Sequence, residues 1–286
     1  MTRYYKVADH TFCVSGEADV FALMEKYELF SCDAGEPVFM LTVSEGEAVN
    51  YLEDTRHSLD KRLVISGHTT NDEAVYEYLW KNETGGWLVC SKDYHEGRLI
   101  LTGKHKEKAI NMAITKMFAL STANKDTAIV HAVAVIYENL SYLFLGPCGT
   151  GKSTHADLWV KYIEGAELLN GDNPVLRIID GRAIAYGSPW SNKQPCYRDE
   201  SSPIGGLVLL NQAPYNKIRR LNQFEAYMVL MKSVNSRRWD KNNADGLHEL
   251  ENKIASTIPM WYLECLPDEE AARLCHSTIT NTSLLV

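Results

Sequence analysis

The chain has 286 residues, of which 45% are hydrophobic and 23% charged, so it is long enough to form one large globular domain or two modest ones. Its net charge of −8 and its pI of about 5.6 argue against nucleic acid or an anionic membrane as the main partner. There is no long apolar membrane segment, no signal-peptide core and no C-x-x-C pair among the seven cysteines, so we expect a cytoplasmic protein without disulfides.

Residues 1–103 are rich in strand-like sequence. Their apolar runs contain many β-branched residues and are bounded by Gly, Asp and Asn, which is typical of strands. The clearest runs are residues 37–43, 62–66, 87–90 and 98–102. No catalytic motif stands out here, so we predict a β-rich N-terminal module over residues 1–103.

The next segment changes from strand-like to helical spacing. Ile110, Ile114 and Met117 fall on one face of a helix predicted over residues 104–121. We place the division between two domains near this helix, so that the second domain covers residues 104–286.

Two strands are predicted after this helix. The first spans residues 126–137, and a hairpin turn at 138–141 leads into the second, the apolar run Tyr142–Leu145. A glycine-rich loop follows immediately, and helical spacing resumes at Thr154.

This loop fits the phosphate-binding pattern G-x-x-x-x-G-K-[S/T], known as the P-loop. The matching residues are Gly146, Gly151, Lys152 and Ser153. Glycines let the backbone turn tightly and direct its N–H groups at phosphate oxygens, and the positive end of the next helix adds to the attraction. The alternative is a chance match in a glycine loop, but the flanking strand and helix favour nucleotide binding.

The motif predicts a role for each of its residues. Lys152 is expected to reach the β- and γ-phosphates of ATP, and the Ser153 hydroxyl to bind Mg²⁺. The predicted nucleotide contacts are Gly146, Gly149, Thr150, Gly151, Lys152, Ser153 and Thr154. Cys148 lies in the same loop, where positive potential would favour a thiolate, although an inert small residue is the simpler interpretation.

Short strands and helices alternate along the rest of the chain, which indicates an α/β domain. Asp180–Gly181 marks a tight turn between two of the strands. The predicted strands are residues 167–170, 175–179, 182–186, 207–210 and 261–264, and the predicted helices are residues 223–235, 245–257 and a last one from 267.

A P-loop needs an acidic side chain downstream, which binds Mg²⁺ and, in a kinase, orients or deprotonates the acceptor hydroxyl. Asp172 is the best candidate because it follows the predicted strand 167–170, one helix after the P-loop. The alternative is a turn aspartate before Asn-Pro. We favour the catalytic, metal-linked role and predict Ser153 and Asp172 as the Mg²⁺ ligands.

The chain from His131 onward resembles the C-terminal catalytic domain of bacterial HPr kinase/phosphorylase. His131-Ala-Val-Ala-Val precedes a turn, a P-loop and a strand that ends near an aspartate, and the loop also resembles the kinase motif of PEP carboxykinases. The nearer likeness is to short HPr-kinase-related proteins of the Bacteroides group, whose hallmarks are similar to residues 168–174, 187–193 and 195–198 here. The likeness covers roughly residues 126–280.

The resemblance implies an α/β fold with a PEP carboxykinase/HPr kinase-like P-loop core and the β-rich module in front of it. It also implies ATP and Mg²⁺ as cofactors, catalytic roles for Asp172, His131 and Lys152, and an oligomer. His131 matches a histidine near the active site of the HPr-kinase type. The alternative for His131 is a strand histidine that is bonded to a backbone partner.

A polar segment after an apparent Pro-Trp turn holds further candidates. Ser188, Ser191, Lys193 and Arg198 could clamp a phosphoryl group or an anionic acceptor. Lys193 and Arg198 are therefore predicted nucleotide-binding residues. As unmatched surface charges they would have no such role.

Two residues depart from the pattern of the resembling proteins. Gly171 replaces the first of two adjacent aspartates, and Asn192 stands where a glycine is expected. The long substrate-binding lobe of PEP carboxykinases has no counterpart, so carboxykinase activity is not expected.

The first hypothesis is an ATP- and Mg²⁺-dependent phosphotransferase that acts on a hydroxyl of a small metabolite or of a serine in a partner protein. Gly171 keeps open the alternative of a weakly active or inactive nucleotide-binding sensor. A phosphorylase that runs the transfer in reverse would use the same residues, because both directions share one transition state.

Overall fold

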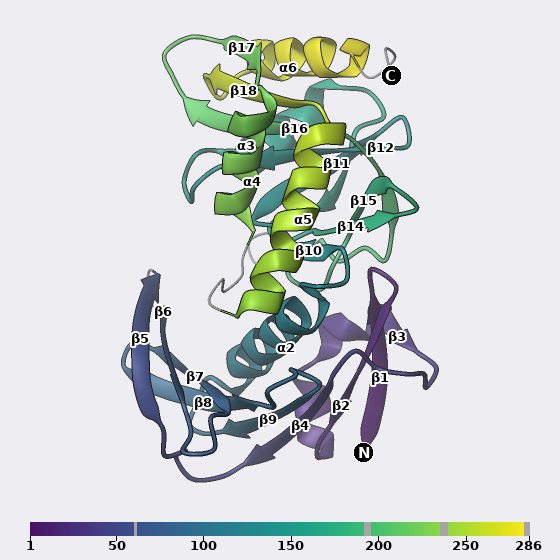
Figure 1. Cartoon of the computed structure of the whole chain (residues 1–286). Coiled ribbons are helices and arrows are strands. Elements are labelled where there is room, and N and C mark those ends of the chain that lie inside the picture. The colour runs from purple at the N-terminus through teal and green to yellow at the C-terminus, as the bar shows by residue number, and fades with distance from the viewer. Residues whose placement is uncertain (60–61, 192–195, 235–239, 283–286) are drawn as a thin grey trace. The chain divides into compact units, whose positions relative to one another are not determined.

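The computed structural model describes residues 1–59, 62–191, 196–234 and 240–282 (Figure 1). The chain belongs to the mixed α/β class that the sequence predicts. Its contacts divide it into two compact units, residues 1–122 and 123–286. Within the described ranges, no helix is long and apolar enough to cross a membrane.

The first unit is built on one nine-stranded mixed sheet, with the strand order β3-β1-β2-β4-β9-β8-β7-β6-β5. Its strands are β1 (Thr2–Val7), β2 (His10–Ser15), β3 (Ser31–Cys32), β4 (Met40–Glu45), β5 (Leu52–Leu59), β6 (Arg62–His68), β7 (Ala74–Trp80), β8 (Glu83–Cys90) and β9 (Glu96–Leu101). Two short helical segments, α1 (Ala18–Ala22) and η1 (Glu25–Phe30), connect β2 to β3. This sheet is the β-rich part of the predicted fold class.

Helix α2 (Lys106–Thr122) packs on this sheet, against β4, β8 and β9. Its side chains Ile110, Ile114 and Phe118 are almost completely buried, and the rings of Phe118 and Phe12 in β2 pack edge to face. The sequence-based division assigned this helix to the second domain. The contacts place it in the first unit instead, because its apolar face covers the first sheet.

The second unit contains a further nine-stranded mixed sheet, in the order β10-β14-β15-β16-β12-β11-β13, with β18 beside β16 and β17 beside β18. Its strands are β10 (Thr127–Ile129), β11 (Ala132–Tyr137), β12 (Leu140–Leu145), β13 (Glu167–Asn170), β14 (Val175–Ile179), β15 (Arg182–Tyr186), β16 (Ser201–Gln212), β17 (Lys217–Arg220) and β18 (Met260–Cys265). Its helices are α3 (Lys152–Tyr162), α4 (Gln223–Ser233), α5 (Lys241–Thr257) and α6 (Glu269–Thr282).

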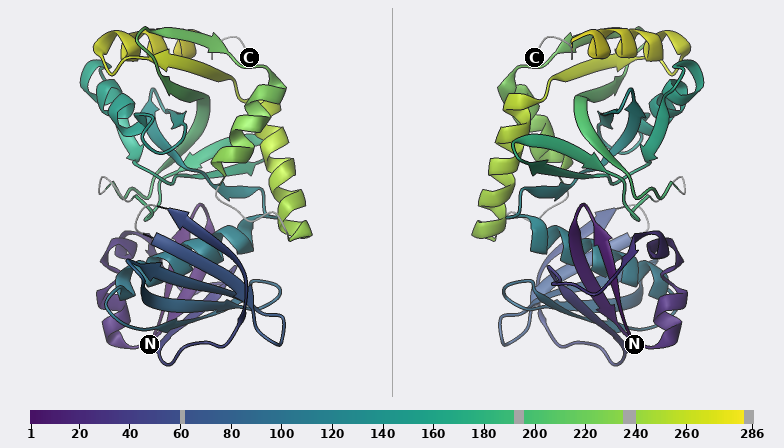
Figure 2. Two further views of the ribbon diagram at one scale, coloured as in Figure 1. Left: turned by 90° about the vertical axis from the view of Figure 1, so that its left-hand side faces the viewer. Right: turned by 90° about the vertical axis from the view of Figure 1, so that its right-hand side faces the viewer.

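Helices cover both faces of this second sheet (Figure 2). Alternate residues of a strand point to opposite faces. Ala134 and Leu143 therefore pack with α4 and α5, whereas Val135 and Phe144 pack with α3 and α6. The sheet and its two helical layers hold the loops at the strand ends in fixed positions.

The predicted strand 126–137 is wrong in one respect: it is interrupted at Val130 and His131, between β10 and β11. The backbone here leaves the sheet because other segments supply its hydrogen bonds. Val130 N–H donates to the carbonyl of Pro174, and His131 N–H donates to the carbonyl of Ser233 at the end of α4. This break places His131 at the margin of the sheet.

Three parallel neighbours, β12, β16 and β18, end at the same edge of the sheet. In α/β sheets, ligands bind outside the carboxyl ends of parallel strands. The P-loop follows β12 at this edge, and the candidate site is built around it.

Candidate active site

The P-loop occupies the turn between β12 and α3. The backbone φ angle is +144° at Gly146, +85° at Gly149 and +94° at Gly151, a region that side-chain-bearing residues rarely adopt. At Gly149 and Gly151, nothing lies within 4 Å of the place where a β-carbon would stand. The loop therefore leaves open space at the positive end of α3, which fits a phosphate group.

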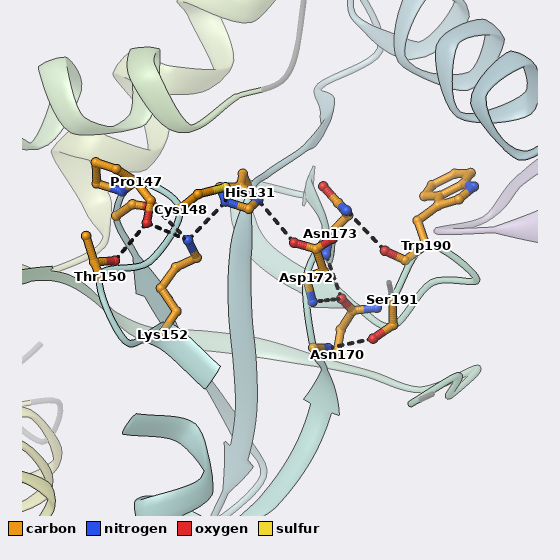
Figure 3. A network of polar contacts seen from close by, with 12 residues as sticks. His131, Pro147, Cys148, Thr150, Lys152, Asn170, Asp172, Asn173, Trp190 and Ser191 are labelled. Atoms are coloured by element: carbon orange, nitrogen blue, oxygen red, sulfur yellow. Dashed lines mark hydrogen bonds and ion pairs between the residues drawn. The ribbon is translucent and has the colours of Figure 1, made fainter. Parts of the chain in front are cut away.

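Lys152, the first residue of α3, directs its amine into this loop. Only 7% of the residue is exposed, and its Nζ donates to the carbonyl oxygens of Gly146 at 2.7 Å and Pro147 at 3.1 Å (Figure 3). The same Nζ lies 3.0 Å from Nε2 of His131. Charge-assisted bonds to phosphate are stronger than bonds to neutral carbonyls. The amine is thus placed to bind a phosphoryl group.

His131 joins Lys152 to Asp172. Its Nδ1 lies 3.2 Å from Oδ1 of Asp172, on the other side of the ring from Lys152. An ammonium donates and cannot accept, so Nε2 of a neutral His131 accepts from Lys152 and the ring proton resides on Nδ1, where it is donated to the carboxylate. The result is a Lys–His–Asp chain of polar contacts, which Figure 3 shows running from the P-loop to the Asp172 loop.

The loop that carries Asp172 is shaped by the buried side chain of Asn170, which has no exposed surface. Its Oδ1 accepts from the backbone N–H groups of Asp172 at 3.0 Å and Asn173 at 2.8 Å. Its Nδ2 donates to Oγ of Ser188 at 3.0 Å. Asn170 therefore fixes the direction in which the Asp172 carboxylate leaves the sheet.

Ser188 and Ser191, in the segment that follows β15, support the same loop. Ser191 Oγ accepts from the N–H of Gly171 at 3.2 Å, and Ser188 Oγ donates to the carbonyl of Asn173 at 2.7 Å. Both serines are buried. Their hydroxyls thus position the Asp172 loop, whereas the sequence grouped them with an anion clamp.

The remaining clamp residues differ in what the structure shows. Arg198 donates to the carbonyl of Leu168 at 3.0 Å and to the Glu167 carboxylate at 2.8 Å, and it pairs with Glu200 at 3.2 Å. These contacts hold Arg198 against β13, so its anion-binding role stays a prediction. Lys193 lies outside the described residues.

Ser153 and Thr154 lie in the first turn of α3, half-buried and exposed respectively. Thr150 Oγ1 donates to the Pro147 carbonyl at 2.9 Å and braces the loop. The described residues contain no group of three or more His, Cys, Asp or Glu side chains that could hold a metal. Mg²⁺ in nucleotide sites needs only one or two protein ligands besides phosphate oxygens and water, so Ser153 and Asp172 suit it chemically.

Two further residues at the loop were not fully predicted. Gln212, at the end of β16, donates from Nε2 to the carbonyl of Gly149 at 2.9 Å and ties the loop to the neighbouring strand. Cys148 is exposed, with Sγ 3.7 Å from Nε2 of His131. No sequence pattern signals Gln212, because its contact spans 63 positions along the chain.

Behind the P-loop, on the face covered by α3 and α6, lies His155. The residue is 3% exposed, and its ring meets Phe144 edge-on at 4.8 Å between centroids. Among the described residues, neither ring nitrogen has a hydrogen-bond partner. Burial lowers the pKa of His155 to about 4, so the ring is neutral at physiological pH and packs as an aromatic group.

Comparisons with known proteins add one structural likeness. No protein-family model and no curated protein matches the chain. A solved structure of the HPr(Ser) kinase/phosphatase from Coxiella burnetii is similar, with 12% identity and a TM-score of 0.32 over 55% of this chain and 96% of that chain. We therefore derive the chemistry of the site from this chain's own residues.

Proposed function

We propose that the chain is an ATP- and Mg²⁺-dependent phosphotransferase that acts on a hydroxyl group of a small metabolite or of a serine in a partner protein. The observation that carries the proposal is the contact chain from Lys152 through His131 to Asp172 at an open P-loop. It brings a phosphate-binding cation and a carboxylate to the two sides of one imidazole.

Each residue of this chain has a role that follows from its position. The P-loop amides and Lys152 bind the triphosphate and stabilise the negative charge that spreads over the transferred group. Asp172 orients the acceptor hydroxyl, and His131 holds the carboxylate in place by donating from Nδ1. The predicted Mg²⁺, bound by Ser153 and Asp172, would supply further charge neutralisation at the phosphates.

A second candidate, a nucleotide-binding sensor with little or no turnover, is favoured by one observation. Gly171 stands where the resembling proteins carry an acid, and it is buried with its N–H bonded to Ser191. Because glycine has no carboxylate, catalysis in this chain would depend on Asp172 as its acid. The sensor shares the nucleotide site and differs only in turnover.

The proposal is tested first by binding. Calorimetric titration of Mg·ATP into the wild-type protein is expected to show micromolar binding that Lys152→Ala abolishes. Lys161→Ala removes an exposed lysine from the last turn of the same helix and serves as the matched control, with binding unchanged. Circular dichroism confirms that each variant is folded.

Turnover separates the two candidates. Slow ATP hydrolysis by the wild type without an acceptor, lost in Asp172→Asn, would support the phosphotransferase and justify a screen of hydroxyl acceptors. Binding without any ATP loss, with or without acceptors, would favour the sensor. If the wild type binds no nucleotide, both are wrong. The predicted cytoplasmic location and homo-oligomer remain proposals beside this one.

A further inference from the structure

The topology of the second sheet determines where the rest of a bound nucleotide can lie. The sheet runs in the order β16-β12-β11-β13 around the P-loop strand β12. Asp172 and His131 belong to the β11–β13 side of the loop. An acceptor that Asp172 orients approaches the transferred phosphoryl group from that side, and the leaving diphosphate lies roughly in line on the opposite side. The nucleoside therefore extends over the ends of β16 and β18.

A short loop, residues 213–216, occupies this opposite side. It leaves β16 at Gln212, passes the end of β18 and enters β17, because β18 lies between β16 and β17. Tyr215 stands in this loop with 49% of its surface exposed. It is one of few large apolar side chains exposed in the described part of the unit, and its loop adjoins the P-loop.

The loop is fixed at both ends. Gln212 Nε2 donates to the carbonyl of Gly149 at 2.9 Å, which links its start to the P-loop itself. Asn216, at its end, accepts from the N–H of Leu266 at 2.8 Å and donates to the Asp268 carboxylate at 3.2 Å. Residues 213–216 are thus held between the P-loop and the start of α6.

The Tyr215 ring is also held. Its hydroxyl donates to Oε1 of Glu264 at 3.1 Å, near the end of β18. This bond raises the pKa of the Tyr215 phenol, so the ring stays neutral. A tyrosine on a loop is by itself an ordinary surface residue. Here a fixed neutral ring lies on the loop that is bonded to the P-loop, on the side away from Asp172.

We propose that Tyr215 is the platform on which the heteroaromatic base of the nucleoside triphosphate stacks. The inference rests on the proposed function, since it assigns the base subsite of the same nucleotide. Asn211, exposed at the end of β16, is the register partner of Glu264 in β18, so its side chain lies on the face of the sheet where Glu264 bonds Tyr215. Its amide offers a donor and an acceptor to the polar edges of the base.

Stacking predicts a particular selectivity. It engages the face of a ring system and not its edge, so it tolerates different bases. We therefore expect Tyr215→Ala to lower the binding affinities for ATP and GTP by similar factors. The affinity for a ligand without a base should not change.

The test compares Mg·ATP with Mg·tripolyphosphate, which has the phosphates and lacks the nucleoside, by calorimetry. Tyr215→Ala is expected to lower the affinity for Mg·ATP by about tenfold or more. Its affinity for Mg·tripolyphosphate should stay within about twofold of that of the wild type. Tyr215→Phe keeps the ring, loses the bond to Glu264 and is expected to bind ATP almost as the wild type does. Phe224→Ala removes another exposed aromatic ring, at the start of α4, and is the matched control with no effect on either ligand.

The outcomes separate this inference from the proposed function. If Tyr215→Ala binds ATP as tightly as the wild type, the subsite is wrong while the phosphate site stands. If Tyr215→Ala weakens the binding of ATP and of tripolyphosphate equally, the residue supports the loop and does not stack on the base. This outcome also overturns the inference. If the wild type binds neither ligand, the nucleotide site and the base subsite are both wrong.

Discussion

The two halves of the candidate site are constructed in opposite ways. The phosphate half, residues 146–154, is a continuous segment whose glycines have positive φ angles, with open space beside Gly149 and Gly151. The acid half, residues 170–173 with residues 188–191, is assembled from two segments whose buried side chains bond to each other and to each other's backbone. His131 contacts both halves. The comparison teaches that phosphate binding resides in local backbone shape, whereas placement of the carboxylate resides in long-range packing.

The largest expected effect comes from the acid itself. Asp172→Asn keeps the shape of the side chain and removes its charge, so the acid half stays folded. We expect turnover to fall by about 10²–10⁴-fold, as is typical when a general base is lost. Binding of ATP without Mg²⁺ should remain within a few-fold of the wild type, because the phosphate half is intact.

Single-turnover kinetics with a saturating nucleotide, beside calorimetry, would measure both quantities. Equal loss of binding and turnover in Asp172→Asn would contradict the division of labour between the two halves. Asp157→Asn, a change of the same chemistry within α3, is the control for a general effect of charge.

The next effect concerns the support of the acid half. Asn170→Ala removes the acceptor for two backbone N–H groups and the donor to Ser188, all within a buried loop. Each buried group left without a partner costs about 1–3 kcal/mol, so for the two N–H groups we expect the free energy of unfolding to fall by about 2–6 kcal/mol.

Urea denaturation measures the loss of stability in Asn170→Ala. Asn281→Ala, at an exposed position near the end of α6, is the control, with a change below about 0.5 kcal/mol. A variant as stable as the wild type, with normal turnover, would show that the Asp172 loop does not depend on Asn170.

A pH effect is expected from His155, which directly follows the phosphate half in α3. Folding lowers the pKa of His155 to about 4 from an ordinary value of 6.5. As the pH falls from about 6.5 to about 4, the unfolded chain takes up the proton first, so stability that is present above pH 6.5 is lost through this window, by up to about 3 kcal/mol.

His155→Phe is expected to reduce the loss of unfolding free energy between pH 6.5 and pH 4. His57→Phe, at an exposed position of the first unit, should leave this pH dependence unchanged. Chemical denaturation at pH 5 and pH 7.5, followed by a probe in the second unit, measures the slope. An undiminished slope in His155→Phe would mean that other groups cause the acid dependence.

The smallest expected effect is a loss of stability from backbone strain when alanine replaces a glycine with a positive φ angle. Gly151 and Gly165 both have φ angles near +90° and open space around the β-carbon position. Alanine at either position should cost about 1–2 kcal/mol of stability. Only Gly151→Ala is expected also to weaken ATP binding, because only Gly151 shapes the phosphate half. Equal binding by the two variants would remove the functional distinction between the two glycines.

The halves also differ in how far the sequence predicts them. The order of strand, glycine loop and helix around Lys152 is local, and its pattern predicts it correctly. The turn at Glu138 and Asn139 is local too, and both residues have the positive φ angles of a tight hairpin. Such features depend on a few neighbouring residues, and their physical causes can be recognised from spacing alone.

The rest depends on contacts between distant segments. The break at His131 exists because Pro174 and Ser233 supply backbone acceptors, and nothing in the apolar run 126–137 signals it. Similarly, β1, β2, β5 and β7 have mixed polar and apolar residues whose strand state follows from pairing with neighbours. The sequence marks Ser188 and Ser191 as polar candidates, but it does not indicate their buried partners in the Asp172 loop.

Strand β16 has a consequence for how this chain can vary between related organisms. Its first residues pair with β15, on the way to the acid half, while its last residues pair with β12 beside the phosphate half and with β18. Inserting or deleting one residue in it would turn every later side chain to the opposite face. Loops elsewhere can lengthen during evolution at little cost, but we expect the length of β16 to stay constant wherever both halves are retained.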